Sequence, residues 1–277
     1  MDLYPDSPIS VGMMREGSVT ARFFEWANRT LMRLSDTNVV LGRCMQERVL
    51  AKGVPADKVV RIPVWADFTG IAGTPRDESP YRQQWGLGSD FTVMYSGNLG
   101  IGHDAKTICQ AMLRLKDESG LKFVFVGAGK RRAEVEAFVK QHNLSNAQWR
   151  EYVPREQLGL SLAAGDVHLI SLKEGCEGIM VPSKLFGVMA AGRAGIFIGN
   201  PASEIGRVLA EHDAGLNIRE GDVDGLVKAI MSLKSYPART AKMGENARQA
   251  VFGRYDKATA TRQWAELIES LVKPRHK

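Results

Sequence analysis

Two short stretches decide the fold of this chain, FTVMYSGNLG at residues 91–100 and KFVFVGAG at residues 122–129. Each is a run of β-branched and aromatic residues that ends in glycine, which is typical of a buried strand leading into a turn. Between them, residues 105–116 place apolar side chains at helical spacing. A strand, a helix and a second strand in this order predict a βαβ unit with parallel strands.

The same alternation continues along the chain. We expect further strands and helices in this order: a helix over 131–141, a strand over 148–152, a helix from 154, a strand over 167–171, a helix over 182–191, and a strand over 195–198. Two more helices, over 239–252 and 258–272, follow a break at Tyr236-Pro237. Short strands alternating with helices predict one α/β domain whose parallel sheet has helices on both faces.

The first 80 residues follow a different pattern. We expect an amphipathic helix over 20–35, a strand over 38–41, a helix over 44–52 and a strand over 58–64. Two strands are too few for a complete α/β domain, and the polar, Gly- and Pro-containing residues that follow indicate a linker. The predicted organisation is a partial N-terminal α/β domain at 1–67, a linker at 68–82, a complete domain at 83–255, and a C-terminal helix at 256–277 that returns to the N-terminal domain.

The composition excludes several classes of protein. With 44% hydrophobic and 25% charged residues in 277, the chain is neither disordered nor of low complexity. Three cysteines without a C-x-x-C pair argue against a disulfide framework or a structural zinc site. No apolar run is long enough to span a membrane, and the N-terminus has no apolar signal core, so we expect a cytoplasmic protein. The net charge of +6 suits anionic partners such as nucleotides or phospholipid surfaces.

In an open parallel sheet, ligands bind at the carboxyl ends of the strands, and three such junctions have suitable chemistry. The first contains Gly97, Asn98, Gly100, Gly102 and His103. Glycines allow a phosphate to approach the backbone closely, so this segment is a candidate phosphate loop. It matches neither the dinucleotide fingerprint nor the P-loop. The alternative is a simple turn after a buried strand.

The second junction combines Gly127 and Gly129 with the cations Lys130 and Arg131 at the start of a helix. Such a helix start would suit a diphosphate or a ribose. A solvated basic face explains the same residues equally well.

The third junction has two parts. Glu174 and Glu177 would suit sugar hydroxyls, and Pro182, Ser183 and Lys184 enter a helix whose free N–H groups favour a diphosphate. Lys184 could add a direct positive charge. The alternative is a loop with surface carboxylates. No sequence motif for a metal cluster or for a Ser or Cys nucleophile accompanies these junctions.

Taken together, the junctions resemble the donor-binding half of a retaining glycosyltransferase of the GT-B fold, of the family 4 type that includes bacterial lipopolysaccharide, O-antigen and capsule transferases. Residues 93–100, 125–129 and 151–158 resemble the family's donor-domain strand and loop, its second glycine turn, and the stretch whose backbone faces the nucleotide base. Residues 182–192 are the most specific match and resemble the helix that contacts the donor diphosphate and ribose. The resemblance implies a complete Rossmann-like donor domain and a partial N-terminal domain.

The resemblance also implies a function: transfer of a sugar, with retention, from a nucleotide-sugar donor to a polyprenyl-diphosphate-linked or glycan acceptor in cell-surface polysaccharide biosynthesis. The donor is expected to be UDP-linked, and neither a metal nor another cofactor is required. The acceptor would place the protein at the inner face of the cytoplasmic membrane, with peripheral contact to anionic lipid; no nucleic-acid partner is expected. The implied donor-binding residues are Gly97, Asn98, Gly100, Lys130, Arg131, Val153, Pro154, Glu174, Glu177, Pro182, Ser183 and Lys184.

This sequence departs from the family pattern at three places. The family's two carboxylates around the last helix, which have seven residues between them, are replaced by Ile179 and Gly187, and Asn98 stands where an arginine is usual. The chain also begins well inside the family's acceptor domain, so the acceptor-side base is expected outside it. We therefore expect exposed apolar surface around Phe23, Trp26 and Leu31.

Three alternatives stay open at this stage. The chain could bind a donor without transferring it, because half a cleft neither excludes water nor positions an acceptor. It could be a nucleotide-sugar epimerase of the same fold, although the carboxylates and histidines expected across such a cleft are absent from the sequence. The helix over 20–35, with its aromatic residues and arginines, is typical of a membrane-interface helix or of a helix packed on its own domain.

Overall fold

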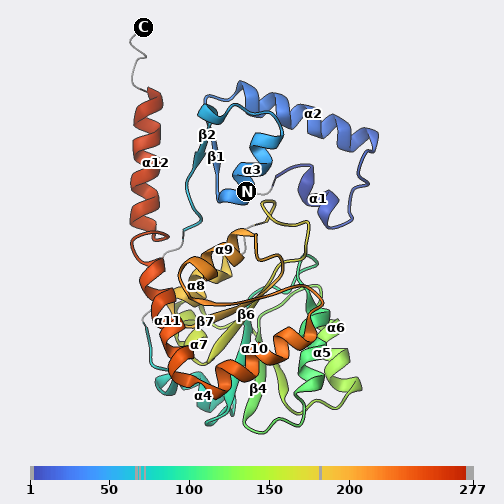
Figure 1. Cartoon of the computed structure of the whole chain (residues 1–277), viewed down its shortest axis with the longest axis vertical. Helices are drawn as coiled ribbons and strands as arrows, with labels where there is room; N and C mark the ends of the chain where they lie inside the picture. The colour runs from blue at the N-terminus through green and yellow to red at the C-terminus, as the bar shows by residue number, and fades with distance from the viewer. Residues whose placement is uncertain (1–2, 66–67, 69, 72, 181–182, 273–277) are drawn as a thin grey trace.

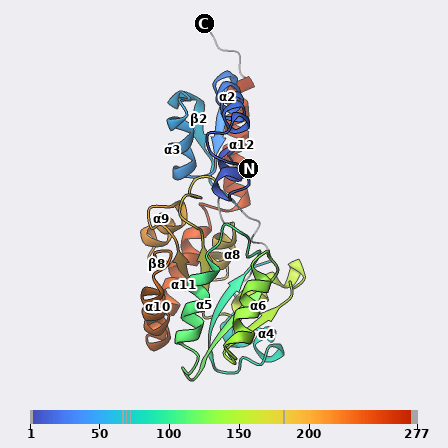
Figure 2. The ribbon, with the colours of Figure 1, turned by 90° about the vertical axis from the view of Figure 1, so that its right-hand side faces the viewer.

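The computed structural model describes residues 3–65, 68, 70–71, 73–180 and 183–272. The chain forms a large α/β body and a smaller N-terminal body above it (Figures 1 and 2). The last helix, α12 (Lys257–Val272), leaves the large body and rises to the level of the small one (Figure 1). Within the described residues, no helix is both long enough and apolar enough to cross a membrane.

The large body is built on a six-stranded sheet in the order β5-β4-β3-β6-β7-β8, with every neighbouring pair parallel. The strands are β3 (Phe91–Ser96), β4 (Leu121–Val126), β5 (Ala147–Arg150), β6 (Val167–Ser171), β7 (Ala194–Ile198) and β8 (Gly215–Ile218). This arrangement confirms the parallel α/β fold. The strand order reverses between β3 and β6, and the crevice at such a point is where ligands bind in open α/β sheets.

Helices cover both faces of this sheet because its strands alternate two sets of apolar side chains. Val93 and Tyr95 of β3 pack in one core with α5 (Ala105–Arg114), α6 (Arg132–Gln141) and α10 (Val223–Ser235). Met94, between them, points to the opposite face and packs against α4 (Pro80–Gln84). The remaining helices pack on that second face: α7 (Leu158–Ala163), α8 (Lys184–Ala190), α9 (Glu204–Glu211) and α11 (Pro237–Val251).

Four elements of the large body differ from the sequence prediction. Strand β8 and helices α9 and α10 were not predicted; β8 is a partly buried edge strand of only four residues, so its pattern is weak. Helix α4 begins at Pro80, within the segment expected to be a linker (68–82), and ends at Gln84, beyond it. It is fixed to the sheet by Arg82, whose guanidinium donates to the carbonyls of Gly88, Asp90 and Ala164.

The N-terminal body has two parallel strands, β1 (Asn38–Val40) and β2 (Val59–Arg61), and three helices, α1 (Asp6–Ser10), α2 (Val19–Leu34) and α3 (Arg43–Ala51). Its core is small and contains Met32, Val40, Met45, Val49, Val54 and Val59. Helix α2 leaves Phe23, Trp26 and Leu31 at 58%, 63% and 66% exposed. The expected apolar surface is therefore present.

Charged groups join the two bodies along α3 and α9. The backbone N–H of Arg43 donates to Glu204 Oε2 at 2.6 Å, and the Arg43 guanidinium pairs with the same carboxylate at 3.1 Å. Arg207 of α9 pairs with Glu47 of α3 at 2.8 Å. These pairs fix the first turn of α3 against the first turn of α9.

Candidate functional site

A cavity of about 760 Å³ opens where the carboxyl ends of β3, β4 and β6 meet the start of α8. Its lining includes Ser96 and Val126, the last residues of β3 and β4, and Leu172, which directly follows β6. Sites for small molecules usually measure roughly 300–1,000 Å³. The cavity therefore has the position and the size of a ligand site at the switch point of the sheet.

The first glycine loop forms one wall of this cavity. Gly97, with φ +127°, and Asn98 both line it. Two backbone hydrogen bonds fix the loop to the end of β4 and to the turn that follows it. The N–H of Gly97 donates to Val126 O and that of Leu99 donates to Ala128 O, both at 2.8 Å. Gly100 is not among the lining residues and lies beside Asn98, whose Nδ2 would be 3.6 Å from a Cβ at position 100.

The second glycine turn supports the first loop. A Cβ on Gly129, which has φ +143°, would come within 2.3 Å of the Leu99 carbonyl oxygen, and one on Gly127 within 2.7 Å of the Gly97 carbonyl oxygen. Only glycine lets the two turns pack this closely. The backbone N–H of Arg131 adds a hydrogen bond to Leu99 O at 3.1 Å.

The cations of the second junction lie away from the cavity lining. Arg131 pairs with Glu134 at 2.9 Å, and Lys130 is exposed. The structure thus brings Gly97 and Asn98 to the cavity but places Lys130 and Arg131 at the outer edge of the supporting turn.

Lys184 is the central charged group of the cavity. Its ammonium donates to the Tyr95 hydroxyl and to Asn98 O at 3.2 Å, and it lies 4.2 Å from the centre of the Tyr95 ring. Within the part of the chain that the structure describes, no carboxylate pairs with it. Burial lowers the pKa of Lys184 to about 7. A half-buried ammonium without a carboxylate partner is the feature of this cavity best suited to an anionic ligand.

His103 is a second polar group on the wall. Its Nδ1 lies 2.6 Å from the Ser171 carbonyl oxygen. Burial, together with the positive charge of Lys184, lowers the pKa of His103 to about 4, so the ring is neutral near pH 7. A neutral ring that donates from Nδ1 to the carbonyl leaves Nε2 as a hydrogen-bond acceptor.

The far end of the cavity follows β5. Val153 lines it as predicted from the resemblance, together with Tyr152 and Arg155, which sequence reasoning missed. The sequence could have indicated Tyr152, because an aromatic residue stands just after the carboxyl end of a predicted strand. Its ring packs over Gly127, and Tyr152 Cε1 would lie 2.8 Å from a Cβ on that glycine. Pro154 precedes a short 3-10 helix (Arg155–Gln157) and does not line the cavity.

Only part of the third junction lines the cavity. Ser183 and Lys184 line the cavity, whereas Pro182 lies outside the described residues. Glu174 and Glu177 are not among the lining residues. The Glu174 side chain lies 3.7 Å from Arg219, and Glu177 Oε2 accepts from the Gly175 N–H at 2.8 Å.

With this geometry in view, the sequence was compared with known proteins. Residues 77–250 match the family described as glycosyl transferases group 1. The chain belongs to this family. The matched segment begins just before α4 and ends in α11, so it contains the whole six-stranded sheet and all the lining residues of the cavity except Trp65 and Ile71.

Two relatives are named as glycosyltransferases, and the name of one of them refers to colanic acid biosynthesis. The chain is 27% identical over 271 residues to the putative colanic acid biosynthesis glycosyl transferase WcaI of Escherichia coli, covering 95% of this chain and 65% of the relative. It is 25% identical to the probable glycosyltransferase WbjE of Pseudomonas aeruginosa, covering 83% and 57%. The chain thus spans 57–65% of the length of these relatives.

Solved structures of low sequence identity share the fold. Sucrose-phosphate synthase of Thermosynechococcus elongatus aligns with a TM-score of 0.76 at 18% identity, covering 95% of this chain and 65% of that one. Anabaena HepE in complex with UDP-glucose aligns with a TM-score of 0.75 at 18% identity, covering 90% and 69%. WaaG, a glycosyltransferase involved in lipopolysaccharide biosynthesis, gives 0.72 at 16% identity, covering 97% and 73%. These matches confirm the GT-B fold.

Proposed function

We propose that the cavity binds a nucleotide-sugar, with UDP as its nucleotide, and that its diphosphate lies against Lys184 and the first glycine loop. The observation that supports this most is the half-buried Lys184 ammonium, which has no carboxylate partner among the described residues. A diphosphate would supply the missing negative charge. Anabaena HepE, which has the same fold, was solved with UDP-glucose, and this favours UDP over other nucleotides.

The reaction proposed for the whole protein is sugar transfer with retention of the anomeric configuration. The bond between the anomeric carbon and the diphosphate breaks, the diphosphate keeps the electron pair, and an acceptor oxygen forms the new bond and loses its proton. Lys184 stabilises the charge that develops on the leaving diphosphate, as preorganised cations do in other transferases. We assign this role to the chain's own cation and propose that no metal is required; full transfer in the presence of EDTA would agree with this.

The proposed acceptor is a polyprenyl-diphosphate-linked sugar or a growing glycan of a cell-surface polysaccharide. The relatives named for colanic acid and amylovoran biosynthesis support this class of acceptor. We further propose that α2 makes peripheral contact with anionic membrane. Its Phe23 and Trp26 rings are exposed and lie 6.1 Å apart. The adjacent Arg22 is also exposed and has no ion-pair partner among the described residues. Sedimentation with anionic liposomes tests this contact, and a Trp26→Ser variant should pellet less.

Gly187 leaves room at the position where relatives of the family carry a carboxylate. It lines the cavity, and a Cβ there would meet only Leu162 Cδ1, at 3.7 Å. We propose that the ribose lies close to the backbone of α8 at this point.

Calorimetric titration with UDP, GDP and dTDP tests the donor site. We expect selective binding of UDP, weakened about tenfold or more in Lys184→Met, because a hydrogen bond to a charged group is worth about 1.5–3 kcal/mol. Lys130→Met is the matched control, since Lys130 is exposed outside the cavity. Binding of none of the three nucleotides would contradict the proposal. Binding without turnover toward any acceptor would instead favour a donor-binding chain that does not transfer.

A further inference from the structure

The loop over residues 173–180, between β6 and α8, touches both bodies of the protein. Its last residue, Met180, lines the donor cavity. On the side of the large body, the N–H of Lys173 donates to Gly102 O at 2.9 Å, and Met180 Cε would lie 2.5 Å from a Cβ on Gly102. Gly102 directly precedes His103, which also lines the cavity. The loop is therefore part of the cavity wall next to the first glycine loop.

Arg48 of α3 holds this loop from the N-terminal body. Its guanidinium donates through Nε to the carbonyl of Glu177 and, at 3.0 Å, through Nη2 to the carbonyl of Gly175. One edge of a planar guanidinium can meet two acceptors in this way, because its donors form a rigid fork. Arg48 therefore fixes two points of the loop backbone at once.

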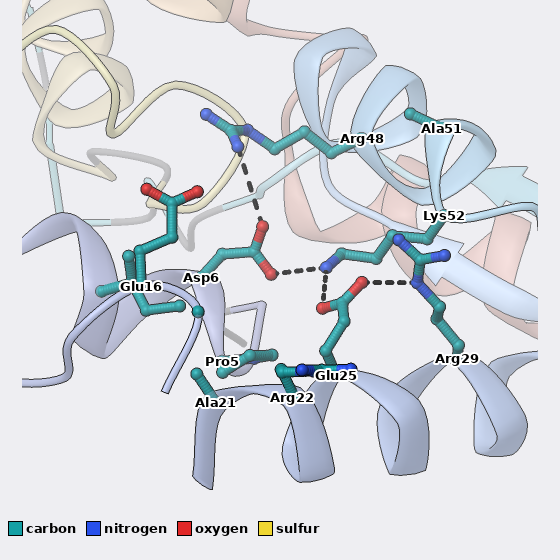
Figure 3. A pocket seen from close by; sticks show the side chains of 12 residues that line it. Pro5, Asp6, Glu16, Ala21, Arg22, Glu25, Arg29, Arg48, Ala51 and Lys52 are labelled. Atoms are coloured by element: carbon teal, nitrogen blue, oxygen red, sulfur yellow. Dashed lines mark hydrogen bonds and ion pairs between the residues drawn. The ribbon is translucent and has the colours of Figure 1, made fainter. Parts of the chain in front are cut away.

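Ion pairs within the N-terminal body orient the Arg48 guanidinium from its other side (Figure 3). Arg48 Nη1 lies 3.8 Å from Asp6 Oδ1, and Lys52 Nζ lies 2.7 Å from Asp6 Oδ2 and 2.5 Å from Glu25 Oε2. These four side chains line a cleft of about 400 Å³ between α1, α2 and α3. Lys52 is only 7% exposed. Arg48 is thus tied to α1 through Asp6, and Lys52 extends the tie to α2.

A close backbone contact fixes the same loop to the start of α3. Gly178 is buried with φ +70°, and a Cβ there would lie 2.5 Å from Cys44 O and 2.9 Å from Met45 N. Only glycine allows this approach. The loop is therefore held between α3 on one side and the first glycine loop on the other.

The donor cavity has chemically different ends on the two sides of Lys184. At the end that follows β5, the Tyr152 ring is 57% exposed and offers a flat aromatic surface on which a planar base can stack. At the other end lie Leu172 and Met180, which follow β6. The order β5-β4-β3-β6 places the end of β3, where Lys184 contacts Tyr95, between these two ends. A nucleotide-sugar with its base at Tyr152 and its diphosphate at Lys184 would therefore have its sugar at the Met180 end.

We infer that Arg48 is a positioning residue for the sugar of the donor. From the N-terminal body it fixes the loop whose Met180 borders that sugar, although Arg48 itself does not line the donor cavity. The inference rests on the proposed function, because it concerns the donor of that transfer. It predicts that recognition of the sugar depends on α3 and that recognition of the nucleotide does not.

Calorimetric titration of the full chain with UDP and, separately, with UDP-glucose, UDP-galactose and UDP-N-acetylglucosamine tests this inference. In Arg48→Met, we expect the Kd of each UDP-sugar that the wild type binds to rise about tenfold, because the loop loses two hydrogen bonds from a charged donor. The Kd of UDP should change by less than about twofold. Arg29→Met is the matched control, since Arg29 lines the same cleft but pairs with Glu25 at 2.6 Å instead of with the loop (Figure 3).

A second pair of variants changes the loop itself. Gly178→Ala would place a Cβ 2.5 Å from Cys44 O and should cause the same selective loss of affinity for the UDP-sugar. Gly175→Ala is its control, because Gly175 has a similar φ of +88° but a Cβ there meets nothing within 4 Å. This pair tests the inference even if Arg48→Met does not fold.

Two results in the variants would overturn the inference. Equal losses of affinity for UDP and for the UDP-sugar in Arg48→Met and Gly178→Ala would show that these changes disturb the whole cavity. Unchanged affinity for both ligands would show that the loop does not depend on α3. A wild type that binds UDP but none of the three UDP-sugars would overturn this inference alone, whereas a wild type that does not bind UDP would overturn the proposed function and the sugar position with it.

Discussion

Binding of UDP should be accompanied by uptake of a proton at Lys184. The pKa of this ammonium is lowered to about 7 by burial, so at pH 8 only about one-tenth of it is charged before the nucleotide binds. A negative charge about 4 Å away contributes about 4 kcal/mol at an effective dielectric constant of 20. That is enough to return the pKa of Lys184 to its ordinary range. Binding at pH 8 should therefore take up about 0.9 proton.

The sign of the pH dependence follows from this uptake. Because the complex holds more protons than the free protein above pH 7, the affinity for UDP should fall by nearly tenfold between pH 7.5 and pH 8.5. The other groups facing the ammonium do not change charge in this range. Burial raises the pKa of Tyr95, and His103 stays neutral with its pKa of about 4. The terminal phosphate of UDP, with a pKa near 6, is already ionised.

Calorimetry at pH 8 in buffers of different ionisation enthalpy measures the uptake directly, because the observed enthalpy varies with the buffer in proportion to the protons exchanged. Lys184→Met should abolish the dependence, whereas Lys130→Met and His103→Asn should keep it. Equal enthalpies in all buffers for the wild-type chain would refute the reasoning. So would an undiminished buffer dependence in Lys184→Met, since another group would then be taking up the proton.

Three further changes test the architecture around the site. Gly129→Ala should lower the free energy of unfolding, measured by urea denaturation, by about 2 kcal/mol and weaken UDP binding, because its Cβ would lie 2.3 Å from Leu99 O. Gly187→Ala is the control in urea denaturation, since a Cβ at that position makes no such close contact. Burial lowers the pKa of His168 to about 4, so His168 binds a proton more readily in the unfolded chain than in the folded one. Lowering the pH from 6.5 to 4.5 should therefore reduce the free energy of unfolding of the wild type by about 2–3 kcal/mol more than that of His168→Gln. Equal losses in the two proteins would contradict this. Arg82→Met should cost about 1–3 kcal/mol, because the carbonyls of Gly88, Asp90 and Ala164 lose their donor; no measurable loss in thermal unfolding would show that α4 does not depend on this arginine.

The sequence predicted the parts of the fold that depend on local pattern. The apolar runs of β3 and β4 and the glycines that follow them were sufficient to predict a candidate ligand site at their carboxyl ends, where the structure has a cavity. The role of Gly129 could not be predicted in this way, because it comes from contact with Leu99, thirty positions earlier in the chain. The same applies to Tyr95: nothing in its own segment indicates that its hydroxyl and ring meet the ammonium of Lys184 from α8.

The relation between the two bodies depends on two arginines of α3. Arg43, in its first turn, meets the α9 carboxylate Glu204 through both its backbone N–H and its guanidinium. Arg48, about one and a half turns further along, reaches the carbonyls of the loop that borders the donor cavity. A helix is rigid over this length, so neither contact can shift without moving the other. Any rotation of the N-terminal body would therefore move α3, the start of α9 and the loop that contains Gly175 and Glu177 together.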